Sequence, residues 1–208
     1  MDFNNDVYSP ELYWIHGFHY SLDGQSIFFK SNKDNGGSSI FDQKVYDNIW
    51  KLDLVTKEIE VITDFFPLNF DLLDFVEDPK QEGNFYISGG ERDVEVVTED
   101  NVYFIDRVDI HYYNSMDNSL IPLFVSDEET EYLSIDPTGE NLVFTTTASG
   151  KSELGSYNIS SQKQKQLTLS DGYRPLNRWY RINWTSPTEF TTNVIRDGEL
   201  NFATFSLE

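Results

Sequence analysis

Four copies of one strand–turn–strand pattern run through the chain, and this repetition limits its possible folds more than any other feature. Each copy has an apolar stretch, a turn with Asp, Pro or Gly, and a second apolar strand that ends in Ser or Thr. The copies are YSLDGQSIFFKS from Tyr20, FVEDPKQEGNFYIS from Phe75, LSIDPTGENLVFTTT from Leu133 and NWTSPTEFTTN from Asn183. A second half follows each copy, as NIWKLDLVTKEIEVIT from Asn48, DIHYYNSMDNSLIPLF from Asp109, ELGSYNISSQKQKQLT from Glu153 and GELNFATFSLE from Gly198.

The first unit predicts four short antiparallel strands, which we name a to d in chain order. They cover Trp14–Tyr20, Ser26–Lys30, Asn48–Leu54 and Glu58–Thr63. The Asp-Gly pair between strands a and b favours a tight hairpin because both residues tolerate positive φ. A sheet of this size cannot bury its own faces, so the unit needs to pack against its copies.

Packing four such sheets around an axis predicts an all-β fold, a small β-propeller of four blades with four antiparallel strands each. The expected blades cover about 9–63, 64–124, 125–168 and 169–208. The fourth unit ends after its third strand, and residues 2–8 precede the first a-strand. We therefore expect residues 2–8 to supply the missing strand and to close the ring, which would remove the open sheet edges.

The units resemble the TolB-type, WD40-like propeller repeat. The resemblance rests on the Ser-Leu-Asp-Gly turn from Ser21, the strand Ile27–Ser31, the strand Ile49–Asp53 and the Lys-Gln-Leu-Thr ending at Thr168. It covers most of the chain, although the second and fourth copies are degenerate, and it implies the fold and little about function. The repeat number fits either a complete four-bladed ring, which we favour, or a piece of a larger propeller.

Charge is the strongest compositional feature. The chain has 36 Asp and Glu residues against 15 Lys and Arg, which gives a formal net charge of −21. This field repels nucleic acid and anionic membranes and speeds encounter with basic proteins. The chain has no Cys, and its N-terminus lacks the basic and apolar regions of a signal peptide, so we expect a cytoplasmic protein.

Long b–c insertions at about 31–47 and 88–107 depart from the usual repeat. In a propeller blade the b–c and d–a connections share one face, and insertions on a single face are typical of a binding surface. Many acids fall in the b–c and d–a connections, among them Asp64, Asp71 and Asp74 in the first d–a connection, so we expect that face to bind a partner. The predicted acidic partner-binding residues are Glu91, Asp93, Glu95, Glu99, Asp100, Asp127, Glu128, Glu129 and Glu131.

An Arg and aromatic cluster stands out in the last d–a connection. Arg174, Arg178 and Arg181 alternate with Tyr173, Trp179 and Tyr180. We include Arg174, Arg178 and Trp179 among the partner-binding residues, because Arg and Trp are enriched at interface hot spots. The alternative is that these arginines pair with neighbouring carboxylates and stack on the tryptophan.

The sequence lacks the motifs that mark common enzyme active sites. The sequence has no Gly-x-Ser-x-Gly elbow, no phosphate-binding loop and no His-Glu-x-x-His, so we predict no enzyme and no cofactor. His16 and His19 are three residues apart on a predicted strand, which should place them on opposite faces and prevent joint metal binding. We interpret Trp50 and Trp184 as repeat-equivalent strand positions and expect them to take part in blade packing, the alternative being that they line a sugar or peptide site.

The leading hypothesis is therefore a non-catalytic propeller that binds a basic protein, specifically an inhibitor or immunity protein for a nuclease toxin. Such a toxin needs a positive surface for phosphates, and an acidic protein can occupy that surface. Two alternatives stay open. One is a carbohydrate-active or hydrolytic propeller with an axial pocket, and the other is a scaffold or sensor domain of a larger protein.

Overall fold

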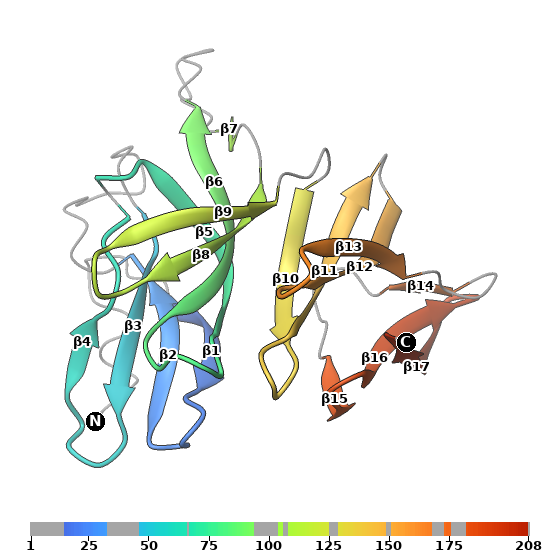
Figure 1. Cartoon of the computed structure of the whole chain (residues 1–208), viewed down its shortest axis with the longest axis horizontal. Helices are drawn as coiled ribbons and strands as arrows, with labels where there is room; N and C mark the ends of the chain where they lie inside the picture. Colours follow the sequence, from blue (N-terminus) through green and yellow to red (C-terminus); the bar gives the residue numbers. More distant parts are fainter. Residues whose placement is uncertain are drawn as a thin grey trace.

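The computed structural model describes residues 15–32, 46–65, 67–93, 104–105, 108–124, 129–148, 151–167, 173–175 and 182–207. The regular elements in these segments are strands, arranged in four antiparallel sheets (Figure 1). The described segments contain no helix, and so none offers an apolar helix of membrane-spanning length. The predicted all-β, four-bladed propeller is confirmed, whereas the predicted closing strand at 2–8 lies outside the described residues.

The first sheet follows the predicted order of strands. It contains β1 (Ile15–Tyr20), β2 (Ser26–Ser31), β3 (Asn48–Asp53) and β4 (Ile59–Val61), each paired with the next. Its a–b turn uses one positive φ, at Gly24 (69°), and the carboxylate of Asp23 accepts the N–H of Gln25 at 2.9 Å. The two-residue turn with two positive φ values occurs instead at Asp197 and Gly198 in the fourth sheet (53° and 81°).

The second and third sheets repeat this arrangement. The second contains β5 (Phe70–Glu77), β6 (Phe85–Asp93), β8 (Asp109–Asn114) and β9 (Ser119–Phe124), with the short β7 (Phe104–Ile105) paired to the end of β6. The third contains β10 (Glu129–Ile135), β11 (Asn141–Ala148), β12 (Lys151–Asn158) and β13 (Lys163–Leu167). Both sheets keep the strand order of the chain.

The fourth sheet differs at both edges. Its a-strand is divided into β14 (Tyr173–Pro175) and β15 (Asn183–Ser186), which pair with opposite ends of the same edge of β16 (Glu189–Arg196). The other edge of β16 is taken along its whole length by β17 (Glu199–Ser206). Within the described segments no d-strand follows β17, in agreement with the sequence pattern.

Hydrophobic side chains fill the contacts between consecutive sheets, because neither face of an isolated sheet could be buried otherwise. Aromatic rings dominate the contact between the first two sheets, where Phe28 meets Phe85 edge-on with ring centroids 5.0 Å apart. The first cluster includes Phe28, Ile49, Phe65, Phe70, Phe75, Phe85 and Ile87. The next two clusters include Tyr86, Ile110, Leu142 and Phe144, and then Val143, Leu154, Leu167 and Phe190.

Each innermost strand carries a β-bulge, which the sequence pattern does not reveal. The pairing register shifts between His16 and His19 in β1, and the other shifts lie between Leu72 and Asp74, Glu131 and Ser134, and Trp184 and Ser186. A bulge adds one unpaired residue, bends the strand and re-aims the side chains that follow. Gly17 has a φ of 65° at the bulge of β1, and Tyr132 adopts 54° in β10.

Candidate functional site

The connections between strands divide between two ends of the molecule. In Figure 1 the β1–β2 and β3–β4 turns lie at the lower end, whereas β6 continues upward to β7. Because antiparallel strands alternate in direction, the a–b and c–d turns share one end, which we call the turn face. The b–c and d–a connections share the other end, which we call the loop face and which carries the predicted binding residues.

Carboxylates on the turn face are occupied by their own turns. Asp53 accepts the N–H groups of Val55 and Thr56, both at 2.7 Å. These hydrogen bonds stabilise the charged form and hold the pKa of Asp53 below its ordinary value. Asp136 likewise accepts the N–H of Thr138 at 2.6 Å. These acids therefore shape the turns of the blades.

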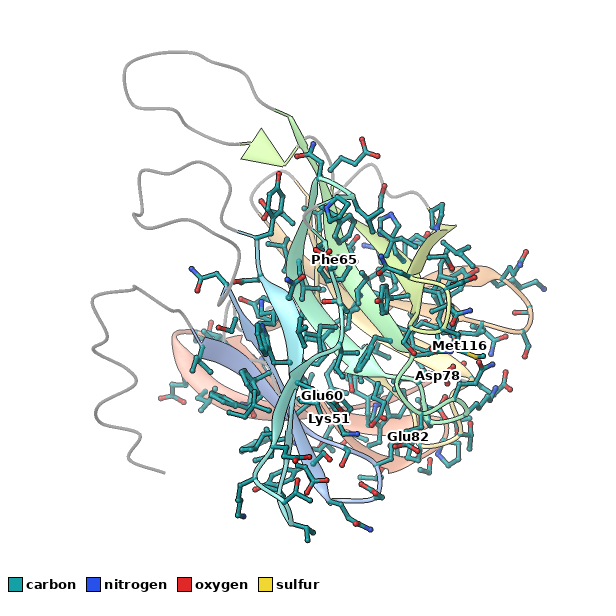
Figure 2. All side chains as sticks on the ribbon, turned by 90° about the vertical axis from the view of Figure 1, so that its left-hand side faces the viewer. Lys51, Glu60, Phe65, Asp78, Glu82 and Met116 are labelled. Carbon is teal, nitrogen blue, oxygen red and sulfur yellow. The ribbon has the colours of Figure 1, made fainter. Side chains whose placement is uncertain are left out.

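The turns of the second blade join in a further polar network on this face. Asp78 accepts the N–H of Lys80 at 2.8 Å and the hydroxyl of Tyr112 at 2.9 Å. Burial, together with the Asp78 carboxylate, raises the pKa of Tyr112 to about 12. In Figure 2, Asp78, Glu82 and Met116 lie along the same side of the molecule.

Polar contacts on the turn face also connect successive blades. Glu77 in the second blade accepts the N–H of Leu22 in the first at 3.1 Å, and Lys80 forms an ion pair with Glu140 in the third at 2.5 Å. Asn141 donates its side-chain N–H to the carbonyl of Pro187 in the fourth at 3.4 Å. The turn face is thus a structural surface as well as an acidic one.

Two described acids of the loop face are different. Asp64 in the first d–a connection and Glu91 near the end of β6 are exposed, and neither carboxylate makes a hydrogen bond or an ion pair within the described segments. Their charges point into solvent without a local structural role. In this they differ from Asp53 and Asp136, although Glu58 and Glu82 of the turn face are exposed as well.

Five of the predicted partner-binding residues fall within the described segments. They are Glu91 and Asp93 at the end of β6, Glu129 and Glu131 in β10, and Arg174 in β14. We assigned the last three to connecting loops, but the inner strands begin earlier than the sequence pattern indicates. The remaining residues lie outside the described segments, so their grouping stays a prediction: Glu95, Glu99, Asp100, Asp127, Glu128, Arg178 and Trp179.

A second group of titratable residues lies where the inner strands meet, and the sequence did not single it out. Asp74 was assigned to a loop, but it lies in β5 at the bulge, with one carboxylate oxygen 3.9 Å from Nε2 of His19 in β1. The other oxygen accepts the main-chain N–H of Leu133 in β10 at 2.8 Å. One carboxylate therefore contacts the inner strands of both neighbouring blades.

Lys30 completes this group, which we call the inner-strand cluster (His19, Lys30 and Asp74). Its ammonium group donates to the main-chain carbonyl of Leu73, next to the bulge of β5. Burial lowers the pKa of Lys30, although Asp74 and other carboxylates favour its charged form. Burial also lowers the pKa of His19, and the nearby Lys30 adds to this effect while Asp74 opposes it.

The bulge in β1 corrects the predicted geometry of the two histidines. His16 pairs with Lys30 and His19 pairs with Phe28, and these two partners are themselves two residues apart on β2. The bulge inserts one residue between these two pairs, so the strict alternation on which the predicted opposite faces rested does not hold between positions 16 and 19. Among the described residues no group of three or more His, Asp and Glu side chains could hold a metal ion.

The two strand tryptophans take part in blade packing, as predicted. Trp50 is buried, and its indole N–H donates to the carbonyl of Ser31 at 3.1 Å. Trp184 packs against Phe190 with ring centroids 5.2 Å apart and donates to the hydroxyl of Ser134 in β10 at 2.9 Å. This second hydrogen bond joins the third and fourth blades.

Comparison with known proteins identifies the fold. No family model and no curated protein matches the chain. Among solved structures, TolB from Acinetobacter baumannii is 14% identical with a TM-score of 0.54, over 93% of this chain and 43% of that one. Putative TolB from Agrobacterium tumefaciens is 10% identical with a TM-score of 0.54, over 91% and 65%.

Peptidase propellers are similar at the same level. Prolyl oligopeptidase B from Galerina marginata is 14% identical with a TM-score of 0.56, over 93% of this chain and 24% of that one. The chain thus spans less than two thirds of the length of these solved chains. At such identities the likeness shows the fold alone.

Proposed function

We propose that this chain, which has a TolB-like β-propeller fold, is a non-catalytic protein that binds a basic protein through its loop face. In its concrete form the proposal is that the chain is an inhibitor or immunity protein that covers the cationic surface of a nuclease toxin. The observation that carries it is the formal net charge of −21. A field of this size accelerates encounter with a cationic surface and disfavours nucleic acid as a ligand.

Two exposed acids of the loop face support its role in binding. Turn-face carboxylates such as Asp53 are used by main-chain N–H groups, whereas the carboxylates of Asp64 and Glu91 are exposed and make no such bonds. Negative charges that lie close together repel one another and destabilise the folded chain. A bound basic protein would reduce this repulsion. The absence of catalytic motifs from the sequence supports a binding role.

The test is capture from the native host at low salt, followed by purification of the captured protein. We expect a basic protein whose affinity falls steeply as salt rises, because exposed charges are screened beyond about 8 Å at physiological ionic strength. If the partner is a nuclease, stoichiometric addition of the chain should abolish its cleavage of nucleic acid. Equal affinity at low and high salt would contradict the proposal.

A pair of charge-reversal variants locates the surface. The variant with Asp64→Lys and Glu91→Lys changes the loop face, and the matched control with Glu58→Lys and Glu82→Lys makes the same change in net charge on the turn face. All four residues are exposed. We expect the loop-face variant to slow association by about tenfold or more and the control to slow it much less. Equal slowing by both would show that net charge acts without a localised site.

A further inference from the structure

Asp-Gly pairs can react within the chain, because glycine has no side chain to hinder the main-chain nitrogen that follows the aspartate. The sequence contains three such pairs, Asp23–Gly24, Asp171–Gly172 and Asp197–Gly198. The second pair lies outside the described segments. The other two occupy turns between antiparallel strands, so their surroundings can be compared directly.

The pair Asp23–Gly24, in the turn between β1 and β2, is held by hydrogen bonds. The N–H of Gly24 donates to the carbonyl of Ser21 at 2.9 Å. The carboxylate of Asp23 accepts the hydroxyl of Ser21 at 2.7 Å and the N–H of Gln25 at 2.9 Å. These two bonds favour the charged carboxylate and lower the pKa of Asp23. Both groups that would have to react are therefore engaged by the turn.

The pair Asp197–Gly198 forms the turn between β16 and β17 (Figure 1) and lacks these restraints. Strand pairing ends with Arg196 opposite Glu199, so neither turn residue belongs to the ladder. Within the described segments the N–H of Gly198 has no hydrogen-bond acceptor. The side chain of Asp197 is 88% exposed and lies 3.7 Å from Nε of Arg196. An exposed ion pair of this kind holds a carboxylate only weakly.

We propose that Asp197 is a site of spontaneous isomerisation to isoaspartate. The main-chain nitrogen of Gly198 attacks Cγ of the protonated Asp197 carboxyl group. A C–N bond forms, and the carboxyl hydroxyl leaves with the proton of the nitrogen as water. The product is a five-membered succinimide ring. A Cβ at position 198 would meet no atom within 4 Å, so the surroundings leave room for this ring.

Hydrolysis of the ring completes the reaction. Water adds to one of the two ring carbonyls and breaks the bond between that carbon and the nitrogen. Opening at the side-chain carbonyl gives isoaspartate's parent, aspartate, again. Opening at the main-chain carbonyl gives isoaspartate, in which the chain continues through Cβ and Cγ and the α-carboxylate is free. Mass and formal charge are the same before and after, and water is the only co-reactant.

Isomerisation at this position changes the hairpin of β16 and β17. The turn joins eight consecutive residue pairs and requires positive φ at both of its residues, 53° at Asp197 and 81° at Gly198. Isoaspartate adds one carbon atom to the backbone, which a two-residue turn cannot accommodate without a shift of the strands. β17 also carries Phe205, which stacks on the buried Phe190 with ring centroids 5.1 Å apart. The fourth blade should therefore become less stable, whether or not the chain binds a basic protein.

The test is incubation of the purified chain in water enriched in oxygen-18, followed by proteolysis in ordinary water and mass spectrometry. Each succinimide that hydrolyses adds one labelled oxygen to its peptide, and fragmentation distinguishes isoaspartate from aspartate. We expect the label to appear at Asp197 at least about tenfold faster than at Asp23, because the hydrogen bonds of Asp23 and Gly24 must break first. Isoaspartate should accumulate at Asp197, and the isomerised fraction should unfold at a temperature about 2–4 °C lower.

Two controls separate the effect of structure from that of sequence. In a urea concentration that unfolds the chain, Asp197 and Asp23 should take up the label at similar rates, because both precede glycine. Asp197→Glu keeps the charge but would require a six-membered ring, so labelling at this position should be lost while labelling at Asp23 stays the same. Equal rates at Asp197 and Asp23 in the folded chain would overturn the proposal, and so would labelling of Asp197 in urea alone.

Discussion

The main-chain N–H of Leu133 donates to the carboxylate of Asp74 at 2.8 Å, which joins the inner strand of the third blade to that of the second. Asp74 occupies the bulge of β5, where the register shift turns its side chain toward the neighbouring strands. The same carboxylate lies 3.9 Å from His19 of the first blade. The innermost part of the propeller is therefore held by polar contacts as well as by apolar packing.

We expect Asp74→Ala to lower the free energy of unfolding by about 1–3 kcal/mol, because the partly buried N–H of Leu133 loses its acceptor. Asp74→Asn keeps an oxygen acceptor at this position, so it should lower the free energy of unfolding by a smaller amount. Urea denaturation of the three proteins measures the difference. A cost for Asp74→Asn equal to that for Asp74→Ala would show that the charge, and not the hydrogen bond, carries the effect.

The inner-strand cluster predicts opposite shifts in the pKa of His19. Burial and Lys30 lower this pKa, and Asp74 raises it. Lys30→Met should therefore raise the pKa of His19, and Asp74→Asn should lower it further. The titration of the imidazole signals by NMR measures both shifts, and a change in the same direction for both variants would contradict the cluster.

The lowered pKa of His19 also affects stability. The unfolded chain binds a proton at His19 near pH 6.5, whereas the folded chain binds it only at lower pH. The folded state therefore loses stability as pH falls from about 6.5 toward the folded pKa. In the Lys30→Met variant the folded pKa of His19 should lie closer to the unfolded value, so the pH range over which stability is lost should become narrower. Urea denaturation at several pH values can detect this change.

Glu77 has the opposite linkage to pH. Burial raises its pKa, although hydrogen bonds from the N–H groups of Leu22 and Gly83 act against this shift. The stability that it contributes is present below the unfolded pKa and is lost as pH rises through the folded pKa. Glu77→Gln removes this titration, so its free energy of unfolding relative to the parent chain should increase between about pH 4 and pH 7. A difference that is constant with pH would contradict the prediction.

Gly155 predicts a packing requirement in the third blade. A methyl group at this position would overlap the ring of Phe144, which is fully buried. Gly155→Ala should therefore lower the free energy of unfolding by about 1–3 kcal/mol through overpacking. Gly198→Ala is the control, since a methyl group there has no neighbour within 4 Å and meets only the strain of a φ of 81°. Thermal unfolding of both variants measures the contrast, and equal costs would argue against overpacking.

The repeated pattern was sufficient to predict the propeller because strand period, turn residues and unit length are local properties of the sequence. Predicted strands such as Ser26–Lys30 and Asn48–Leu54 lie within one residue of β2 and β3. The packing role of Trp50 and Trp184 was also predicted, although the structure places Trp50 in the third strand of its sheet, β3, and Trp184 in the inner strand β15. The described residues contain no d-strand after β17, as the sequence pattern of the fourth unit predicted.

The bulges in the inner strands could not be predicted, and they changed the site most. A bulge depends on how one strand pairs with its neighbour, and the alternation of residues in one strand contains no record of it. For this reason His16 and His19 were placed on opposite faces, and Asp74 was assigned to a loop. Gly17 inside an otherwise regular strand was the one local signal of the bulge in β1.

The sequence by itself determined the class of fold, the four units and the acidic charge, because these depend on composition and on short periodic patterns. Only the tertiary structure decided which acids are used by turns and which inner-strand residues meet around Asp74. Those properties arise from contacts between blades that are distant in the chain, such as the hydrogen bond from Leu133 to Asp74. The local sequence pattern determines where the strands form, and the packing of the strands determines which contacts each side chain makes.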